Sequence, residues 1–440
     1  MTEKHAVGQL RRLLPMAMSY MASGGSLIVA SAAQLITFAI LARFLGVEEF
    51  GLYVAVTAVT AIAIHLCGLG ATECLVRRVA RDKSIYPIML GHNIILTVAS
   101  SVVLVAIGLV VLPYFYPLSP DMAINVGATL LLLLTNIPLV RGILLTEQIF
   151  LGHSDFRSAN KVVLSFGLAR TAAAALACLV FGVNTIAEWV VWQFLCHVIV
   201  AAGCVYSLRN LGRPKYGIVG EEIKQGLYFS IPFIIRAVRQ NADLLILGLV
   251  TAPEIVGSYS VARRILESSY LSVEAMNRLI YPGSARASMN GLHAAMGLVR
   301  KVAIAAVSIS AATAITVFIC APLLPLLFGH EYVSMVDFVR ILCWVVVPMA
   351  MWAIAVEALG AAGHHAVRAT VMGGGSLVGA ALTAWATWYA PPTGTFISFY
   401  VIEFMMVGIS WAVLLRLARS SRSQSQEPVV DAPVEQGKGA

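Results

Sequence analysis

The sequence predicts an all-α, polytopic membrane protein with about twelve transmembrane helices in two six-helix lobes. Composition is the first reason: 59% of the 440 residues are hydrophobic, 12% are charged and the mean hydropathy is +0.85. Such values are typical of a chain whose solvent is a bilayer. Apolar runs of membrane-spanning length also recur along the whole chain. Finally, basic residues gather in alternate connections between these runs, as in membrane proteins of defined orientation.

The apolar runs match the hydrocarbon thickness of a bilayer, which about 20 helical residues cross. Arg11 and Arg12 precede the first run, as in a signal peptide, but the many later spans favour a retained first helix. All connections are short, so no appended soluble domain is expected. The predicted spans are residues 19–42, 51–72, 88–112, 122–145, 162–182, 186–207, 226–250, 255–280, 302–327, 333–358, 367–390 and 395–416.

The connections after even-numbered spans carry the basic residues, and those after odd-numbered spans hold nearly none. The positive-inside rule therefore places both termini in the cytoplasm. The basic connections contain Arg77, Arg78, Arg81, Lys83, Arg157, Lys161, Arg209, Arg213, Lys215, Lys224, Arg286, Arg300, Lys301 and Arg368.

A short internal repeat divides the chain into two halves. The pattern E-x-x-G-x-Y occurs at residues 48–53 and 254–259, at an offset of 257 − 51 = 206 residues, and a Leu-Gly pair recurs at 151–152 and 359–360. An even number of spans per half gives parallel repeats with a site at their interface. We expect lobes at residues 1–207 and 226–417, a cytoplasmic linker at 208–225 and a disordered cytoplasmic tail at 418–440.

The sequence indicates no metal or cofactor chemistry. The seven cysteines lie in apolar segments without a CxxC pair and are interpreted as small apolar residues. His65 and His197 fall inside spans and are interpreted as packed or hydrogen-bonded side chains. The basic residues are dispersed over loops and helix ends, which argues against nucleic acid as a partner.

Four stretches of the sequence form recognisable motifs: residues 39–46 with 48–53, 241–248 with 256–263, 325–332 and 358–363. In order and placement they resemble the polysaccharide flippases (Wzx-type transporters of O-antigen or exopolysaccharide) of the multidrug/oligosaccharidyl-lipid/polysaccharide (MOP) superfamily. The resemblance implies a V-shaped transporter, not an enzyme, in the bacterial cytoplasmic (inner) membrane. It would move a polyprenyl-pyrophosphate-linked oligosaccharide to the outer leaflet by alternating access. The implied partners are this saccharide substrate, membrane lipid and a polymerase or glycosyltransferases of the same pathway.

Charged residues inside the predicted spans are the candidate site. A pyrophosphate crossing the bilayer requires a wet cationic cavity, for which the planar fork of arginine is suited. The candidates for head-group contact are Arg170, Arg236, Arg239, Arg263 and Arg264. Gln34, Gln240 and Tyr270 are available for sugar hydroxyls, and the candidate ion-coupling or ion-pairing acids are Asp243, Glu267, Glu274 and Glu403.

These charges allow a second interpretation, because Arg239 and Asp243, like Arg263 and Glu267, are four residues apart and can neutralise each other in a structural ion-pair network. Arg170, Arg236 and Arg264 lack an obvious local partner and are the sharper candidates for anion binding. Arg141 and Arg278, near cytoplasmic span ends, are interpreted as snorkelling.

Two other functions remain open. A multidrug extruder of the same superfamily is the first alternative, because it shares the twelve-helix plan. A membrane enzyme acting on lipid-linked sugars is the second. The short loops and the absence of a paired-aspartate motif disfavour the enzyme.

Overall fold

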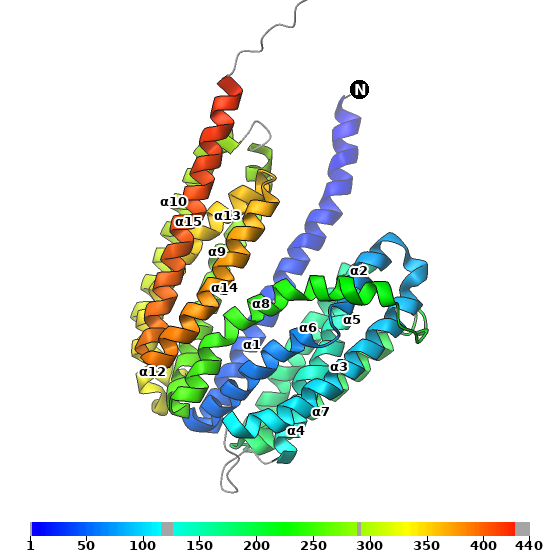
Figure 1. Cartoon of the computed structure of the whole chain (residues 1–440), viewed down its shortest axis with the longest axis vertical. Coiled ribbons are helices and arrows are strands. Elements are labelled where there is room, and N and C mark those ends of the chain that lie inside the picture. Colours follow the sequence, from blue (N-terminus) through cyan, green and yellow to red (C-terminus); the bar gives the residue numbers. More distant parts are fainter. Residues whose placement is uncertain (1, 116–125, 288–291, 427–440) are drawn as a thin grey trace, which may run out of the picture. The chain divides into compact units, whose positions relative to one another are not determined.

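The computed structural model describes residues 2–115, 126–287 and 292–426, and it describes their side chains except for residues 2–28, 114–115, 272, 274–287, 294 and 421–426. In these ranges every regular element is a helix (Figure 1). Nine helical stretches of the described residues are long and apolar enough to cross a membrane. The first of them, Val29–Leu66, combines the first two predicted spans, and the predicted spans 226–250 and 255–280 lie in the charged helices α8 and α9. The predicted all-α membrane fold is confirmed.

The first half of the chain forms seven α-helices, and two π-helical turns continue α4 and α6. In chain order they are α1 (Thr2–Leu66), α2 (Ala71–Arg81), α3 (Tyr86–Phe115), α4 (Val126–Leu134), η2 (Thr135–Leu139), α5 (Val140–Gly152), α6 (Phe156–Ala175), η3 (Leu176–Val180) and α7 (Ile186–Leu208), with a 3₁₀ turn, η1 (Lys83–Ile85), before α3.

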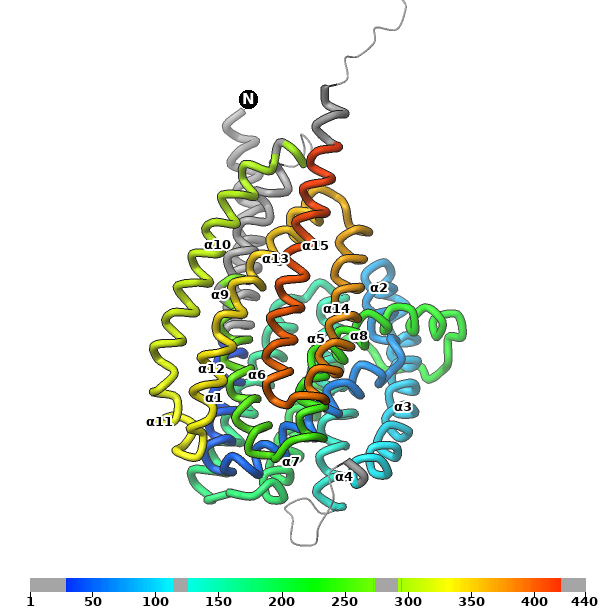
Figure 2. The backbone as a smooth tube through the Cα atoms, turned by 60° about the vertical axis from the view of Figure 1, so that its left-hand side comes forward, coloured from blue at the N-terminus to red at the C-terminus, as the bar shows by residue number. Residues whose placement is uncertain are grey.

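The second half forms eight α-helices (Figure 2). They are α8 (Gly220–Val250), α9 (Pro253–Ala287), α10 (Leu292–Cys320), α11 (Leu324–Phe328), α12 (Val333–Leu342), α13 (Val346–Ala361), α14 (His365–Tyr389) and α15 (Thr393–Gln426). Short 3₁₀ turns, η5 (Ala321–Leu323), η6 (His330–Tyr332) and η7 (Cys343–Val345), connect α10 to α13.

Two helix boundaries differ from the prediction. The expected loop at residues 47–50 is helical, and the two spans it was to separate are both part of α1. The interruption is confined to Gly46, whose φ of +77° suits glycine and redirects the chain without a polar loop. At the other end, α15 continues to Gln426, eight residues past the expected start of the tail at residue 418. Residues 427–440 lie outside the described residues.

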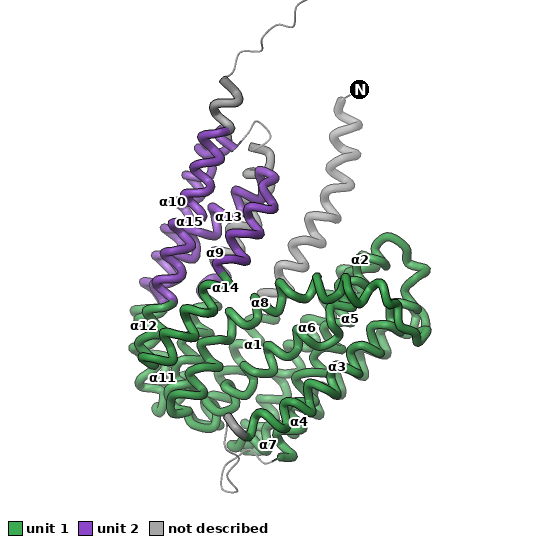
Figure 3. Tube along the Cα trace, viewed as in Figure 1, with its two compact units in different colours: residues 1–268, 317–342, 376–398 green, residues 269–316, 343–375, 399–440 purple. Residues whose placement is uncertain are grey.

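The chain divides into two compact units (Figure 3). Unit 1 contains residues 1–268, 317–342 and 376–398, and unit 2 contains residues 269–316, 343–375 and 399–440. Unit 1 therefore combines the helices of the first predicted lobe with α8 and the first part of α9. The lobe limits inferred from the repeat stay a prediction.

Within unit 1, the two copies of the E-x-x-G-x-Y pattern touch each other. A Cβ atom on Gly51 would overlap the Pro253 carbonyl oxygen and lie 2.9 Å from the Gly257 nitrogen, and one on Gly257 would overlap the Val47 carbonyl oxygen. The repeat offset relates Val47 to Pro253, since 47 + 206 = 253, and Gly51 to Gly257. The contact is thus reciprocal, as expected for two copies related by a two-fold axis. It is consistent with the internal repeat.

The turns that end α5 and α13 also share their geometry. Ser154 (φ +63°) donates its N–H to the Leu151 carbonyl, and Gly363 (φ +82°) donates its N–H to the Gly360 carbonyl. The two equivalent turn residues, Ser154 and Gly363, are 363 − 154 = 209 residues apart, whereas the two Leu-Gly pairs are 359 − 151 = 208 residues apart. Hydrogen bonding of the turn, rather than side-chain identity, therefore defines the equivalent residues here.

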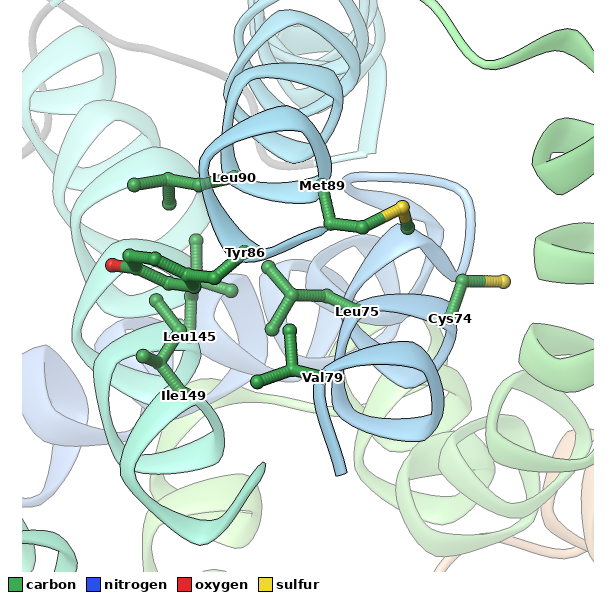
Figure 4. Packing of buried hydrophobic residues seen from close by; sticks show 8 residues of the cluster. All are labelled: Cys74, Leu75, Val79, Tyr86, Met89, Leu90, Leu145 and Ile149. Atoms are coloured by element: carbon green, nitrogen blue, oxygen red, sulfur yellow. The ribbon is translucent and has the colours of Figure 1, made fainter. Parts of the chain in front are cut away.

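A dry cluster fixes α2 against α3 and α5 (Figure 4). Each helix contributes residues spaced three or four apart, which places them on one face. Because such a core is closely packed, it sets the rotation of all three helices about their axes. The cluster consists of Cys74, Leu75, Val79, Tyr86, Met89, Leu90, Leu145 and Ile149.

Candidate functional site

A buried ion pair joins the two charged helices α8 and α9. Arg263 Nη1 donates a 2.5 Å hydrogen bond to Asp243 Oδ1, and the Tyr259 hydroxyl donates a 2.6 Å hydrogen bond to Asp243 Oδ2. Arg263 Nη2 donates to the carbonyl of Gln240. Asp243 is 1% exposed and Arg263 is 9% exposed. Because the opposite charges are paired and hydrogen-bonded, the cost of burying them is offset within the pair.

The short connection between α8 and α9 brings these residues together. α8 ends at Val250 and α9 begins at Pro253, so the helices form an antiparallel hairpin. Proline is well suited to the first position of a helix, where its missing N–H costs nothing. Tyr259 and Arg263 are four residues apart and share the face of α9 that meets Asp243.

Glu267 extends the pair into a network. Its Oε1 lies 3.3 Å from Arg263 Nε, and its Oε2 accepts a 3.1 Å hydrogen bond from Arg264 Nη1. The prediction that Arg264 lacks a local partner is therefore wrong. Glu267 lies three residues after Arg264 as well as four after Arg263, and its two oxygens serve both arginines.

Arg236, about two turns before Asp243 on α8, has a different environment. Its side chain is exposed and makes no hydrogen bond or ion pair with the part of the chain that the structure describes. Asp243 is bonded across the hairpin to Arg263 rather than to Arg239 one turn away. Arg239 is half-buried, and the side chain of Gln240 is exposed on the same helix.

Arg170 on α6 lies in a separate aromatic setting. Its guanidinium carbon is 5.6 Å from the centre of the Phe166 ring, which is an ordinary cation–π distance. The same ring meets His197 edge-on, with 5.2 Å between ring centres. Gln34 is exposed on α1. The structure therefore gathers the hairpin residues into one network and gives Arg170 neighbours on α6 and α7.

The remaining predicted residues belong to unit 2 or lie outside the described side chains. Glu403 is buried, and its Oε2 accepts a 2.5 Å hydrogen bond from Trp352 Nε1. Tyr270 is half-buried and also belongs to unit 2. The side chains of Glu274 and Arg278 lie outside the described residues.

Sequence reasoning missed a chain of uncharged polar side chains in the first half. The Tyr53 hydroxyl donates to Gln193 Oε1 at 3.1 Å, Gln193 Nε2 donates to Asn136 Oδ1 at 3.0 Å, and Asn136 Nδ2 donates to Thr60 Oγ1 at 3.2 Å. The π-helical turn η2 presents Asn136 to this chain. One signal was available, because Tyr53 corresponds to Tyr259 in the repeat and both hydroxyls donate to a buried side chain.

Arg141 also differs from its prediction, because it does not snorkel. It is 7% exposed, and its Nη2 donates a 2.8 Å hydrogen bond to Thr72 Oγ1. The same nitrogen lies 3.9 Å from Glu73 Oε2. Thr72 also accepts from Asn93 Nδ2 at 3.2 Å, and the Thr97 hydroxyl donates to Asn93 Oδ1 at 3.1 Å. This polar group lies on the same helices as the dry cluster of Figure 4.

Outside the predicted spans, Glu222 holds the start of α8 against α2. It is buried, and its two oxygens accept hydrogen bonds of 2.8 Å from Arg77 Nη2 and Arg78 Nε. Burial alone raises the pKa of Glu222, but the hydrogen bonds from Arg78 and Cys74 and the charges of Arg78 and Arg77 outweigh it. The pKa of Glu222 is therefore lowered from its ordinary value, and the carboxylate is ionised at neutral pH.

All seven cysteines are free, and six are buried. Within the described ranges, no group of three or more His, Cys, Asp or Glu side chains is placed to hold a metal ion.

Comparisons with known proteins identify the family to which this all-helical, multi-pass chain belongs. The profile of the family described as "Polysaccharide biosynthesis protein" matches residues 20–288, which is 269 of the 440 residues. The chain belongs to this family. The resemblance seen in the sequence is thereby confirmed. No curated protein matches the chain.

Solved structures of MOP-superfamily transporters share the fold. An inward-facing multidrug resistance MATE transporter is 14% identical with a TM-score of 0.73, and the match covers 90% of this chain and 96% of that one. The MATE multidrug transporter DinF-BH is 13% identical with a TM-score of 0.61, covering 91% and 94%. A MOP-superfamily transporter from Pyrococcus furiosus is 13% identical with a TM-score of 0.58, covering 92% and 96%. These likenesses establish the fold alone.

Proposed function

We propose that this transporter flips a polyprenyl-pyrophosphate-linked oligosaccharide, the repeat unit of a surface polysaccharide, from the cytoplasmic to the outer leaflet of a bacterial inner membrane. The family match supports a role in polysaccharide synthesis. The observation that carries the proposal is the unpaired charge of Arg236 within α8, on the same hairpin in which Asp243, Arg263, Arg264 and Glu267 are paired. An exposed cation at this depth is costly unless it faces water or meets an anion.

The contacts narrow the head-group candidates. Arg263 and Arg264 are both engaged with carboxylates. We assign Arg263, bonded to Asp243, to holding α8 against α9, and Arg264, bonded to Glu267, to the ion pairs along α9. Arg236 is the first candidate for the pyrophosphate, and Arg170 and Arg239 are the second. A guanidinium binds phosphate oxygens in pairs and stays charged at any physiological pH. Gln34, Gln240 and Tyr270 remain proposed contacts for sugar hydroxyls.

For energy coupling, we propose Asp243 over Glu403. An ion-coupled transporter requires a carboxylate whose charge state or partner differs between conformations. Asp243 accepts hydrogen bonds from two donors on α9, Tyr259 and Arg263, so a shift of α9 relative to α8 would change its partners. Transport by Asp243→Asn protein in vesicles, with and without a proton or sodium gradient, tests this. Unchanged gradient dependence would remove Asp243 from the proposal.

The head-group proposal is tested in cells that depend on this protein for surface polysaccharide. Arg236→Ala should lower the polysaccharide about 10- to 100-fold, because one charged hydrogen-bonding group is lost. Lipid-linked oligosaccharide should accumulate inside, while the amount of protein in the membrane stays unchanged. Arg157→Ala, at an exposed position at the start of α6, is the matched control. Normal polysaccharide in Arg236→Ala would contradict the proposal.

Multidrug extrusion is the alternative, since two of the structural neighbours described above are multidrug transporters. Its usual cationic substrates would meet repulsion from Arg236, so we rank it second. Cells with and without the protein should therefore retain a cationic dye equally. If the wild type extrudes the dye and the Asp243→Asn variant does not, that result would favour the multidrug alternative.

The family and fold are those of transporters, not enzymes. We propose that the protein works beside the glycosyltransferases and polymerase of its pathway and has no nucleic-acid partner.

A further inference from the structure

We propose that Arg141, Glu73, His65 and Arg236 form an entry site for the diphosphate between α1, α2, α5 and α8, in which the Glu73 carboxylate holds the place of the incoming diphosphate. The inference rests on the proposed function and deepens it: it names where the head group first binds and which carboxylate it displaces. The positive-inside pattern places His65, Glu73 and Arg141 toward the cytoplasmic ends of their spans, where a lipid-linked precursor would enter, and Arg236 lies deeper on α8.

Arg141 is held in place yet incompletely bonded. Its Nη2 donates to Thr72, but its Nε is buried and has no hydrogen-bond partner in the described structure. Glu73 Oε2 is likewise buried without a hydrogen bond, and its 3.9 Å distance from Arg141 Nη2 is too long for one. A buried guanidinium and carboxylate normally close such a gap. Both groups therefore keep bonding capacity that a ligand can use.

A second cation lies near the same place. Arg236 on α8, like Arg141 on α5 and Glu73 on α2, is close enough to His65 on α1 to act on it electrostatically. Arg236 has no ion pair among the described residues, as noted above. With His65 neutral, two arginines and one glutamate give the group a net charge of +1. Departure of the Glu73 side chain would raise it to +2 and match the two negative charges of a diphosphate diester.

The frame around Arg141 is rigid, which favours a preformed site over a chance contact. Arg141 continues the face of Leu145 and Ile149 on α5, and Thr72 continues the face of Leu75 on α2. These apolar residues belong to the dry cluster of Figure 4, so the polar group rests directly on a packed core. The hydrogen-bonded series from Thr97 through Asn93 to Thr72 orients the oxygen that Arg141 contacts.

The chemistry is an exchange of counter-ions. The Nε and Nη2 groups form one edge of a guanidinium, and such an edge binds two oxygens of a phosphate side by side. Glu73 opposes this binding by competing for Arg141, and its half-buried side chain can turn outward. The two halves of the site thus predict opposite effects of substitution. Loss of Arg141 should weaken diphosphate binding, and loss of the Glu73 charge should strengthen it.

Binding is measured with the full-length protein in phosphatidylcholine nanodiscs, using farnesyl diphosphate and inorganic pyrophosphate as probes. Glu73→Gln should bind farnesyl diphosphate about tenfold more tightly than wild type, and Arg141→Gln about 10- to 100-fold more weakly. Glu188→Gln removes the same charge from an exposed position on α7 and should leave affinity unchanged. Tighter binding of farnesyl diphosphate than of pyrophosphate identifies a lipid-linked ligand; equal binding identifies the free anion, and either result supports a diphosphate site.

A purely structural Arg141–Glu73 pair predicts no gain of affinity in Glu73→Gln, and that result would overturn the inference even if Arg141→Gln fails to fold. Transport of lipid-linked oligosaccharide by the wild type separates this failure from failure of the proposed function. If the wild type transports but Glu73→Gln binds farnesyl diphosphate no more tightly, the diphosphate site proposed here is wrong and the proposed function stands. If the wild type neither transports nor binds farnesyl diphosphate, both the site and the proposed function are wrong.

Discussion

The arginines of α8 and α9 differ in how their charge is compensated, and this difference governs what a substitution does. Arg263 is buried and shares Asp243 with the Tyr259 hydroxyl, whereas Arg236 is exposed and unpaired within the described structure. Removing a partner of a buried pair leaves an uncompensated charge, while removing an unpaired cation leaves the fold intact. Substitutions in the Arg263–Asp243 pair should therefore lower the stability of the protein, whereas substitution of Arg236 should lower transport and leave stability unchanged.

Asp243→Asn should destabilise the protein by about 3 kcal/mol, because Arg263 would keep only the exposed Glu267 as counter-ion. Thermal unfolding of the purified protein in detergent measures the change. Tyr259→Phe should cost less, about 1 kcal/mol, since it removes one hydrogen bond. Asp337→Asn makes the same chemical change at an exposed position of α12 and is the control. Equal stability of Asp243→Asn and Asp337→Asn would contradict a structural ion pair.

Glu222 gives a second prediction, this one of pH dependence. Its pKa is lower in the folded protein than its ordinary value, so the unfolded chain takes up the proton more readily. The stability that Glu222 provides is therefore fully present above the ordinary value of about 4.3 and is lost as the pH falls through the lower folded pKa. Melting temperatures from pH 7 to pH 3 should drop less steeply for Glu222→Gln than for wild type. Parallel curves would show that other carboxylates govern the acid response.

Single residues also show where sequence reasoning succeeds and fails. Charged residues inside spans stand out because the bilayer penalises them, so Asp243 and Arg263 could be identified directly. Their partners depend on the rotation of each helix about its axis, which composition does not reveal. The pairing of Arg264 with Glu267 was therefore not predicted. Uncharged polar residues such as Gln193 and Asn136 give no signal above the apolar background. Their role depends on three helices meeting.

At the scale of elements, backbone contacts at glycine determine how the helices approach. The Gly51–Pro253 contact leaves no room for a side chain, and neither does Gly70 against the carbonyl of Gly226. The first contact joins α1 to α9, and the second joins the turn before α2 to α8. Neither helix pair could be predicted from apolar periodicity, because spans buried in lipid are apolar on every face.

Gly51→Ala should prevent the protein from accumulating in the membrane, because the new methyl group would overlap the Pro253 carbonyl oxygen. Gly203→Ala on α7 is the matched control, since nothing lies within 4 Å of its Cβ position. Alanine there should be neutral or stabilise the helix by up to about 1 kcal/mol. Membrane abundance and size-exclusion profiles report both outcomes. Normal accumulation of Gly51→Ala would mean that α1 and α9 are less closely packed than described.

At the scale of the whole molecule, the membrane simplifies prediction. A spanning segment must be helical and of fixed length because lipid offers no hydrogen bonds to the backbone, so spans can be predicted from hydropathy. Each of the twelve predicted spans overlaps a helix of the described residues, with the first two joined through Gly46, and nine described stretches have the length and hydropathy of a span. Turn geometry and helix pairing depend on contacts between distant residues, and these required the structure.

The predicted orientation can be checked by labelling single cysteines in a variant whose native cysteines are replaced. Lys83→Cys lies in a predicted cytoplasmic turn, and Asn184→Cys lies in a predicted outer turn. A membrane-impermeant maleimide added to intact spheroplasts should label the Asn184→Cys variant and reach the Lys83→Cys variant only after permeabilisation. The reverse pattern would invert the topology and place the termini outside.

The reciprocal contact of Gly51 and Gly257 bears on how such a chain could arise. In a half-length ancestor that paired with itself, both glycines would have been one residue, so a single mutation there would have introduced the clash twice. After duplication and fusion, the position remained constrained from both sides, while the surrounding lipid-facing residues could exchange one apolar side chain for another. The shortness of the surviving pattern is then the expected trace of an old duplication: it is retained where the copies meet and lost elsewhere.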